Sequence, residues 1–138
     1  MDRNIYKSKT ISQFHELIIM NAYEILYTQF NHDLEACFQS SDLNELAIHA
    51  LNENLLGIAS GVAAEFDGYM RSDGFLRQYP PSFETLEHLS TKCEAMYLAG
   101  LREGLPDVPD HVCVELAKIM GSYVVGGVAL EMLKDGEV

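Results

Sequence analysis

Two stretches decide the fold, and together they make up nearly half of the chain. They read TISQFHELIIMNAYEILYTQFNHDLEACF over residues 10–38 and DLNELAIHALNENLLGIASGVAAEFDGYM over residues 42–70. In both, apolar residues recur at steps of three and four, the spacing that places side chains on one face of an α-helix. The pattern predicts two long amphipathic helices. Their expected inner positions include Phe14, Leu17, Ile18, Ile25, Phe30, Leu34 and Phe38, then Leu43, Leu46, Ala47, Leu51, Leu55, Ile58, Val62 and Phe66.

Both stretches open on residues that are typical of helix starts. Thr10 and Gln13 have the form of a capping box, in which the hydroxyl accepts from the Gln amide and the Gln side chain reaches back. Asp42, followed by Glu45, gives a second start of the same kind. The first two helices are therefore expected to begin close to residues 10 and 42.

The residues before Thr10 differ from the rest of the first half. They are polar and carry Arg3, Lys7 and Lys9, a third of the nine basic residues of the chain. We expect residues 1–9 to form a flexible basic arm. The remaining residues, 10–138, have the length of one ordinary domain with a single core, and they are predicted to form one helical domain.

The second half of the chain continues the helical pattern. Ser82 is a suitable cap for a third helix, whose inner face includes Phe83 and Leu86, and Gly104 and Pro106 end it. A fourth helix follows to about Lys134. The predicted fold is all-α, an antiparallel bundle of four long helices at residues 10–38, 42–70, 83–103 and 108–134.

Two segments admit a second interpretation. Residues 122–131 contain a Gly-Gly pair and could form a hairpin, but helix is favoured because an isolated two-stranded hairpin is marginally stable. Residues 67–72 and 73–78 repeat the pattern Asp-Gly-aromatic-aliphatic-Arg-polar. The repeat either forms a short hairpin within the 67–81 loop or begins as the frayed end of the second helix.

The second helix also carries Gly57 and Gly61, which weaken a helix by about 1 kcal/mol each relative to Ala. We expect this cost to be offset by the close backbone approach of a neighbouring helix.

Charge is distributed unevenly. The chain has 21 acidic and 9 basic residues, a net charge of −12, and residues 10–70 contain no Lys or Arg. This balance argues against direct binding of nucleic acid or of an anionic membrane, because both require a clustered basic face. It is compatible with a basic protein partner. The uncompensated carboxylates are those of Glu16, Glu24, Asp33, Glu35, Asp42, Glu45, Glu53, Glu65 and Asp67.

The residues offer no pattern for a cofactor, a metal or catalysis. Three cysteines without C-x-x-C spacing predict neither a zinc motif nor a disulfide framework, and they favour the reducing cytoplasm. His32, His49 and His111 fall at one end of the predicted bundle, but His49 and His111 lie on solvent faces. No signal peptide is visible, and the longest uncharged apolar segments, of ten and twelve residues, are shorter than a membrane span. We expect no cofactor, no metal and no enzymatic activity.

The leading hypothesis is a noncatalytic acidic interaction protein that binds a basic protein through the first two helices, as an inhibitor, an immunity protein or a nucleic-acid mimic. The expected binding residues are Glu24, Asp33, Glu35, Glu45, Glu53, Asp67, Arg71, Asp73 and Arg77.

The alternative hypothesis is a homodimer, because the apolar arc of the first helix is wider than one face. Its expected interface consists of Ile19, Met20, Tyr23 and Tyr27, and its role would be housekeeping or the binding of a small apolar ligand. A third class, an enzyme without a recognisable motif, has no residue pattern in its favour.

Overall fold

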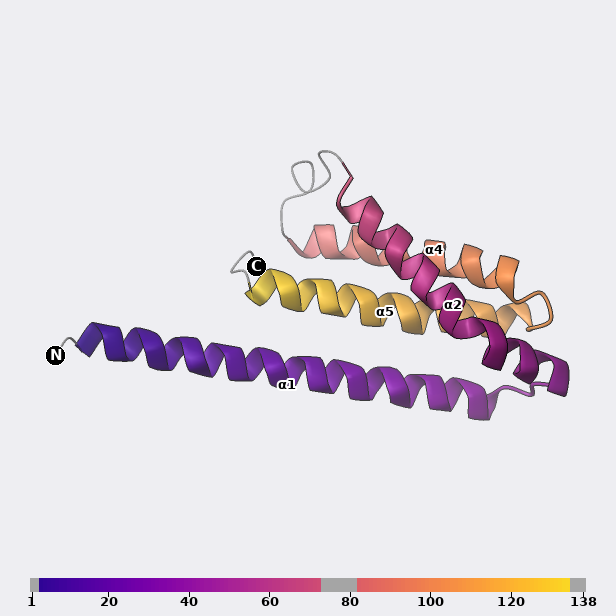
Figure 1. Cartoon of the computed structure of the whole chain (residues 1–138), viewed down its shortest axis with the longest axis horizontal. Coiled ribbons are helices and arrows are strands. Elements are labelled where there is room, and N and C mark those ends of the chain that lie inside the picture. Colours follow the sequence, from indigo (N-terminus) through magenta and orange to yellow (C-terminus); the bar gives the residue numbers. More distant parts are fainter. Residues whose placement is uncertain (1–2, 73–81, 135–138) are drawn as a thin grey trace.

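The computed structural model describes residues 3–72 and 82–134, with side chains described at residues 20–72 and 82–132. Four helices account for the secondary structure of these residues, and they alternate in direction along the bundle (Figure 1). The prediction of an all-α antiparallel bundle is confirmed. The helices are α1 (Arg3–Ser40), α2 (Glu45–Met70), α4 (Phe83–Gly104) and α5 (Asp110–Lys134).

The order of packing differs from the order of the chain. Helix α5 packs against both α4 and α1, and α2 packs against α4. The last two helices therefore form the centre of the bundle, and the first two lie on either side of it. Figure 1 shows that α1 and α2 come together at the turn that joins them and diverge away from it.

The core is built from the inner faces of all four helices. Fully buried side chains include Phe66 of α2, Leu89 and Leu101 of α4, and Val112 and Leu116 of α5. Among the described side chains of α1, residues 20–40, Cys37 is the fully buried one. The described part of α1, residues 20–40, thus contributes fewer buried side chains than α2, α4 or α5 does.

The second half of α5 is helical, so the hairpin at residues 122–131 is excluded. Its glycines lie where neighbouring helices come close. A Cβ atom at Gly121 would stand 3.3 Å from the backbone of Glu94 in α4, and one at Gly126 would stand 2.8 Å from a methyl group of Leu26 in α1. Close packing therefore offsets the cost of glycine within this helix.

Helix α5 is also the one described helix long and apolar enough, by length and composition, to span a membrane. The sequence prediction counted only uncharged apolar segments, which are too short to span a membrane. Helix α5 is longer because it continues through the charged residues Glu115 and Lys118. The buried side chains of Val112, Leu116 and Ala117 contact the rest of the core. Helix α5 has this apolar composition because it packs against both α4 and α1.

Two of the predicted helix starts are corrected by the structure. Helix α1 begins at Arg3, not at Thr10, because the polar residues between them include no Gly or Pro to stop it. Residues 3–9, predicted to be a flexible arm, are the first turns of this helix. Helix α2 begins at Glu45, and its cap is Asn44, whose side chain accepts from the Ala47 amide at 2.8 Å.

The other helix boundaries agree with the sequence pattern. Ser82 caps α4 as predicted, accepting from the Thr85 amide at 3.1 Å. Helix α2 ends at Met70, with Arg71 as its C-cap, so residues 67–70 belong to the helix and not to a hairpin. The second copy of the Asp-Gly repeat, residues 73–78, lies outside the described residues.

The close approach expected at Gly57 and Gly61 is found elsewhere. A Cβ atom at either glycine would meet nothing within 4 Å. At the α2–α4 contact, the glycines that admit a neighbour are on α4: a Cβ at Gly100 would stand 2.7 Å from Val62, and one at Gly104 would clash with Ile58. The α2–α4 contact therefore places branched side chains of α2 against glycines of α4, and leaves the glycines of α2 uncovered.

Candidate functional site

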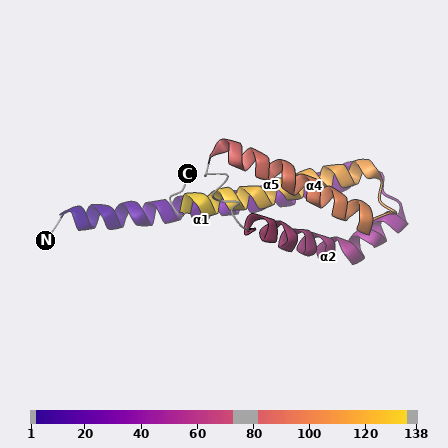
Figure 2. The ribbon, with the colours of Figure 1, turned by 90° about the horizontal axis from the view of Figure 1, so that it is seen from above.

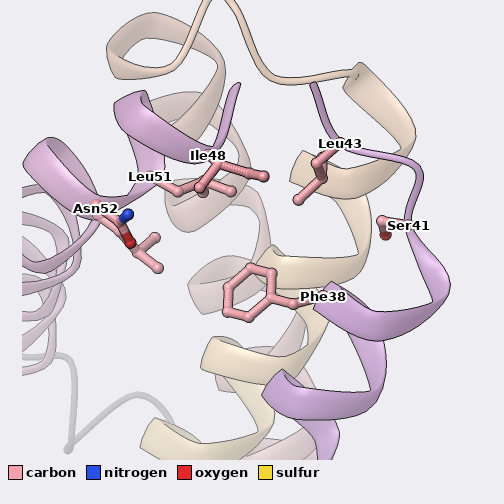
Figure 3. Close-up of a pocket in the computed structure, with 7 residues that line it drawn as sticks. Phe38, Ser41, Leu43, Ile48, Leu51 and Asn52 are labelled. Carbon is pink, nitrogen blue, oxygen red and sulfur yellow. The ribbon is translucent and has the colours of Figure 1, made fainter. Parts of the chain in front are cut away.

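An apolar hollow lies where α1 and α2 begin to diverge, and Figure 3 shows its lining. Its volume is about 340 Å³. Phe38 projects into it from the end of α1, opposite Leu51 of α2, with Leu43 of the connecting turn beside them. Ser41 and Asn52 are its polar members. The hollow exists because the two helices separate before their apolar faces can meet.

A second hollow, of about 240 Å³, lies further along the same side of α1. The rings of Phe30 and Tyr123 stack at 4.4 Å between centroids on one side of it. Ala59 and Ala63 of α2 form the other side, and Tyr97 lies between, its hydroxyl donating to the Ala59 carbonyl at 3.5 Å. Side chains as small as Ala leave this space open.

The third hollow, of about 550 Å³, lies where α1 leaves the other helices. It is lined by Met20, Tyr23, Glu24 and Tyr27 of α1, and by Tyr123, which also lines the second hollow. The three hollows thus follow one side of α1, and we call them together the α1 groove, which residues of α2 line at the first two hollows and Tyr123 of α5 at the second and third. Its lining along α1 is Met20, Tyr23, Tyr27, Phe30 and Phe38, with Ala59 and Ala63 opposite and Tyr123 between.

The structure brings together three of the residues expected at a dimer interface. Met20 and Tyr27 are 67% and 56% exposed at the outer end of the groove. Tyr23 is half-buried, and its hydroxyl donates to the Glu131 carboxylate of α5. The side chain of Ile19 lies outside the described residues. Large exposed apolar side chains beside a hollow are typical of interaction surfaces.

A second apolar surface lies on the outside of α2. Glu45, Leu46, His49, Glu53 and Leu56 are all exposed, and their spacing places them on one side of the helix. We call these five residues the α2 outer patch. Leu56 is 80% exposed and Leu46 59%, so the prediction that Leu46 faces the core is wrong. The patch combines two carboxylates with two large apolar side chains.

Exposed apolar side chains are concentrated on the first two helices. Seven large hydrophobic residues are exposed among the side chains that the structure describes, and six of them belong to α1 or α2. Sequence spacing indicated Met20 and Tyr27, in the wide apolar arc of the first helix, but it placed Ile25, Leu46 and Phe83 on inner faces. The seven are Met20, Ile25, Tyr27, Leu46, Ile48, Leu56 and Phe83.

The carboxylates expected to bind a partner do not form one continuous face. Glu24 lines the groove, whereas Asp33, half-buried, accepts from the Gln29 amide at 2.7 Å and lies 3.9 Å from the ring of His32. Glu35 accepts from Gln39 at 3.2 Å on the exposed surface of α1.

On α2, the carboxylates are grouped differently. Glu45 and Glu53 belong to the α2 outer patch and have no ion pair with Lys or Arg within residues 20–72 and 82–132. Asp67 pairs with Arg71 at 2.8 Å one turn later. Asp73 and Arg77, also expected to bind, lie outside the described residues.

The cysteines are packed as apolar side chains. Cys37, Cys93 and Cys113 are all buried and reduced. Burial raises the pKa of Cys93 to about 12, and burial together with the Glu115 carboxylate raises that of Cys37 to about 11. Burial raises the pKa of Cys113 as well. Such thiols stay protonated at neutral pH, and a protonated thiol is a poor nucleophile.

The histidines do not converge. His32, His49 and His111 are each exposed. Among the described residues, no group of three His, Cys, Asp or Glu side chains is arranged to hold a metal ion.

No family model, curated protein or solved structure matches this chain.

Proposed function

We propose that the protein is a noncatalytic interaction protein that binds a basic protein partner through the α2 outer patch and exposed carboxylates of α1 such as Glu35. The observation that carries the proposal is the coincidence of two features on the same helices. Six of the seven exposed large hydrophobic residues described lie on α1 and α2, and so do carboxylates such as Glu45 and Glu53 that have no basic partner there.

Each feature has a separate role in binding. Leu46 and Leu56 offer apolar area whose burial would supply affinity. Glu45 and Glu53, beside them, favour a basic partner, speed its encounter and disfavour acidic competitors. The uncovered glycines Gly57 and Gly61 continue the same helix beyond the patch, where a partner could approach the backbone of α2 closely.

The proposal assigns no catalytic role to the cysteines. The strongest nucleophiles in the described part of the chain, the three thiols, are buried with raised pKa values. The exposed surfaces described above are apolar or acidic, and they suit the binding of a partner better than catalysis.

The test is partner capture with charge-reversed variants of the full chain. Glu35→Lys/Glu45→Lys/Glu53→Lys reverses exposed carboxylates of α1 and α2. The control, Glu87→Lys/Glu103→Lys/Asp107→Lys, changes the net charge equally at exposed positions of α4 and its following turn. We expect a basic protein to be recovered by the wild type and the control in a salt-sensitive manner, and to be lost by the first variant. Equal recovery by both variants would contradict the proposal.

A further inference from the structure

The first hollow lies beside the α2 outer patch. Ile48 and Asn52, which line the hollow, and Leu56, which belongs to the patch, follow one another at steps of four residues along α2. Ile48 is 45% exposed and Leu56 80%, so apolar surface continues from the hollow onto the patch. The turn that joins α1 to α2, and the hollow with it, lies at the end of the bundle away from the N-terminus of α1 (Figure 2). A molecule that covers the patch would therefore also cover the opening of the hollow.

The size and the lining of the hollow suit one large side chain. Its volume of about 340 Å³ is at the lower end of the range of about 300–1,000 Å³ for ligand pockets. Phe38 lies opposite Leu51, with Leu43 beside them (Figure 3). These apolar side chains offer contact to an aromatic ring, and aromatic side chains contribute much of the binding energy at protein interfaces.

Two polar side chains of the hollow distinguish between aromatic rings. Ser41 donates its hydroxyl to the Cys37 carbonyl at 2.6 Å, which leaves the hydroxyl oxygen able to accept a hydrogen bond. Asn52 carries an amide that can both donate and accept. A buried indole or phenol needs a partner for its N–H or O–H group, and these two side chains can supply one. The lining therefore favours Trp or Tyr over Phe.

The charge around the hollow is negative. Three exposed carboxylates lie within three residues of its lining along the chain, and none of them forms an ion pair with Lys or Arg within residues 20–72 and 82–132. An aromatic side chain with basic neighbours is therefore favoured at this place over one with acidic neighbours. The three carboxylates are those of Glu35, Asp42 and Glu45.

We propose that the first hollow receives a Trp or Tyr side chain of the basic partner, with Lys or Arg residues on either side of it facing Glu35, Asp42 and Glu45. This inference rests on the proposed function and makes it more specific, because it names the group of the partner that is buried at the edge of the α2 outer patch. The carboxylates select a basic partner, and the hollow supplies affinity.

The test uses defined peptides and the full chain. The chain contains no Trp, so the fluorescence of a peptide Trp reports only on the peptide. The probes are Lys-Arg-Trp-Arg-Lys, its counterpart with Ala in place of Trp, and Glu-Asp-Trp-Asp-Glu, all with blocked ends. In NMR titrations we expect the first peptide to bind at least about tenfold more tightly than the second, and the acidic peptide not to bind. The emission of the first peptide should shift to shorter wavelength as it binds.

Two variants of α2 separate the hollow from the acidic surface, and neither changes the net charge. Asn52→Phe introduces a larger side chain at the hollow and should remove the advantage of Trp over Ala. Asn54→Phe is the matched control, because Asn54 is also exposed but lies on nearly the opposite side of α2. The control should retain the difference between the two peptides. Circular dichroism verifies the folding of both variants.

The possible failures can be told apart. Equal affinity of the Trp and Ala peptides, with chemical-shift changes at Glu45 and Glu53, would overturn the inference and leave the proposed function in place. Failure of both basic peptides to bind at low salt would contradict the two together. Equal affinity for uncharged N-acetyltryptophanamide would assign the hollow to a small neutral molecule, and shifts at Ile48 that depend on protein concentration alone would assign it to a second copy. Either result would overturn the inference.

Discussion

Gly121 of α5 lies directly against Glu94 of α4. A Cβ atom at position 121 would stand 3.3 Å from both the Cα and the backbone nitrogen of Glu94, closer than ordinary packing allows. The two central helices approach each other at this point, and the core around Leu116 and Met120 is arranged beside it. At Gly57 and Gly61 of α2, in contrast, a Cβ atom would meet nothing within 4 Å.

Substitution of Gly121 by Val should lower the free energy of unfolding by about 1–3 kcal/mol, because α4 must move to admit the side chain. Gly57→Ala and Gly61→Ala should instead raise it by about 0.5–1 kcal/mol each, since Ala favours helix and nothing lies within 4 Å. Urea denaturation measures all three. A loss of stability in Gly57→Ala would show that a neighbouring molecule or segment fills that space.

The N-caps of α2 and α4 are expected to contribute to stability to a similar degree. Asn44→Ala and Ser82→Ala each remove a side-chain acceptor from an amide at the start of a helix. Each substitution should cost about 1 kcal/mol of stability, measured by thermal denaturation. Asp42→Ala is the control for the first cap and should leave stability nearly unchanged, because the structure places Asp42 before the cap and not in it.

The exposed ion pair between Arg102 and Asp110 links the end of α4 to the start of α5. Two hydrogen bonds join them, at 2.7 and 3.0 Å, and they hold the pKa of the Asp110 carboxyl below its usual range. A lowered pKa means that the pair stabilises the native state above the ordinary pKa of Asp and ceases to do so as the pH falls through the lowered value. Asp110→Asn should therefore have a small effect at neutral pH, and none in acid or in high salt.

The buried thiol of Cys93 and the buried phenol of Tyr97 predict a loss of stability at alkaline pH. The pKa of Cys93 is raised from 9.0 to about 12 by burial, and that of Tyr97 from 10.0 to about 12. Above pH 9 the unfolded chain releases these protons while the native state retains them, so stability should fall as the pH rises towards 12. Cys93→Ala should show a shallower fall in the free energy of unfolding. An identical slope in the variant would mean that this thiol ionises in the native state.

The same burial predicts slow reaction of the thiols. At neutral pH, a thiol reagent should modify Cys37, Cys93 and Cys113 only after denaturant is added. Rapid modification of the native protein would place at least one thiol at the surface.

Much of the fold was predictable from the sequence, because each helix has apolar residues at helical spacing. The sequence also predicted Ser82 correctly as a helix cap. The cap at Asn44 was missed because Asp42 offered a competing pattern two residues earlier. The extension to Arg3 was missed because a polar segment without apolar spacing gives no sign of helix.

The binding surfaces were less predictable. Spacing shows that Leu46 and Ile25 lie on faces of helices, but it does not show whether any neighbour covers those faces. Helix α2 packs on α4, where Val62 and Ile58 lie against Gly100 and Gly104, and this choice of neighbour is a property of the assembled bundle. The wide apolar arc that includes Met20 and Tyr27 was the one signal in the sequence that pointed to the groove.

Binding of the charge-reversed variants to a basic protein partner, measured as the salt concentration is raised, tests the central claim that the exposed carboxylates of α1 and α2 recognise that partner. We predict that Glu35→Lys/Glu45→Lys/Glu53→Lys loses the partner, whereas Glu87→Lys/Glu103→Lys/Asp107→Lys keeps it and releases it only at high salt. Equal recovery of the partner by the two variants would contradict the claim.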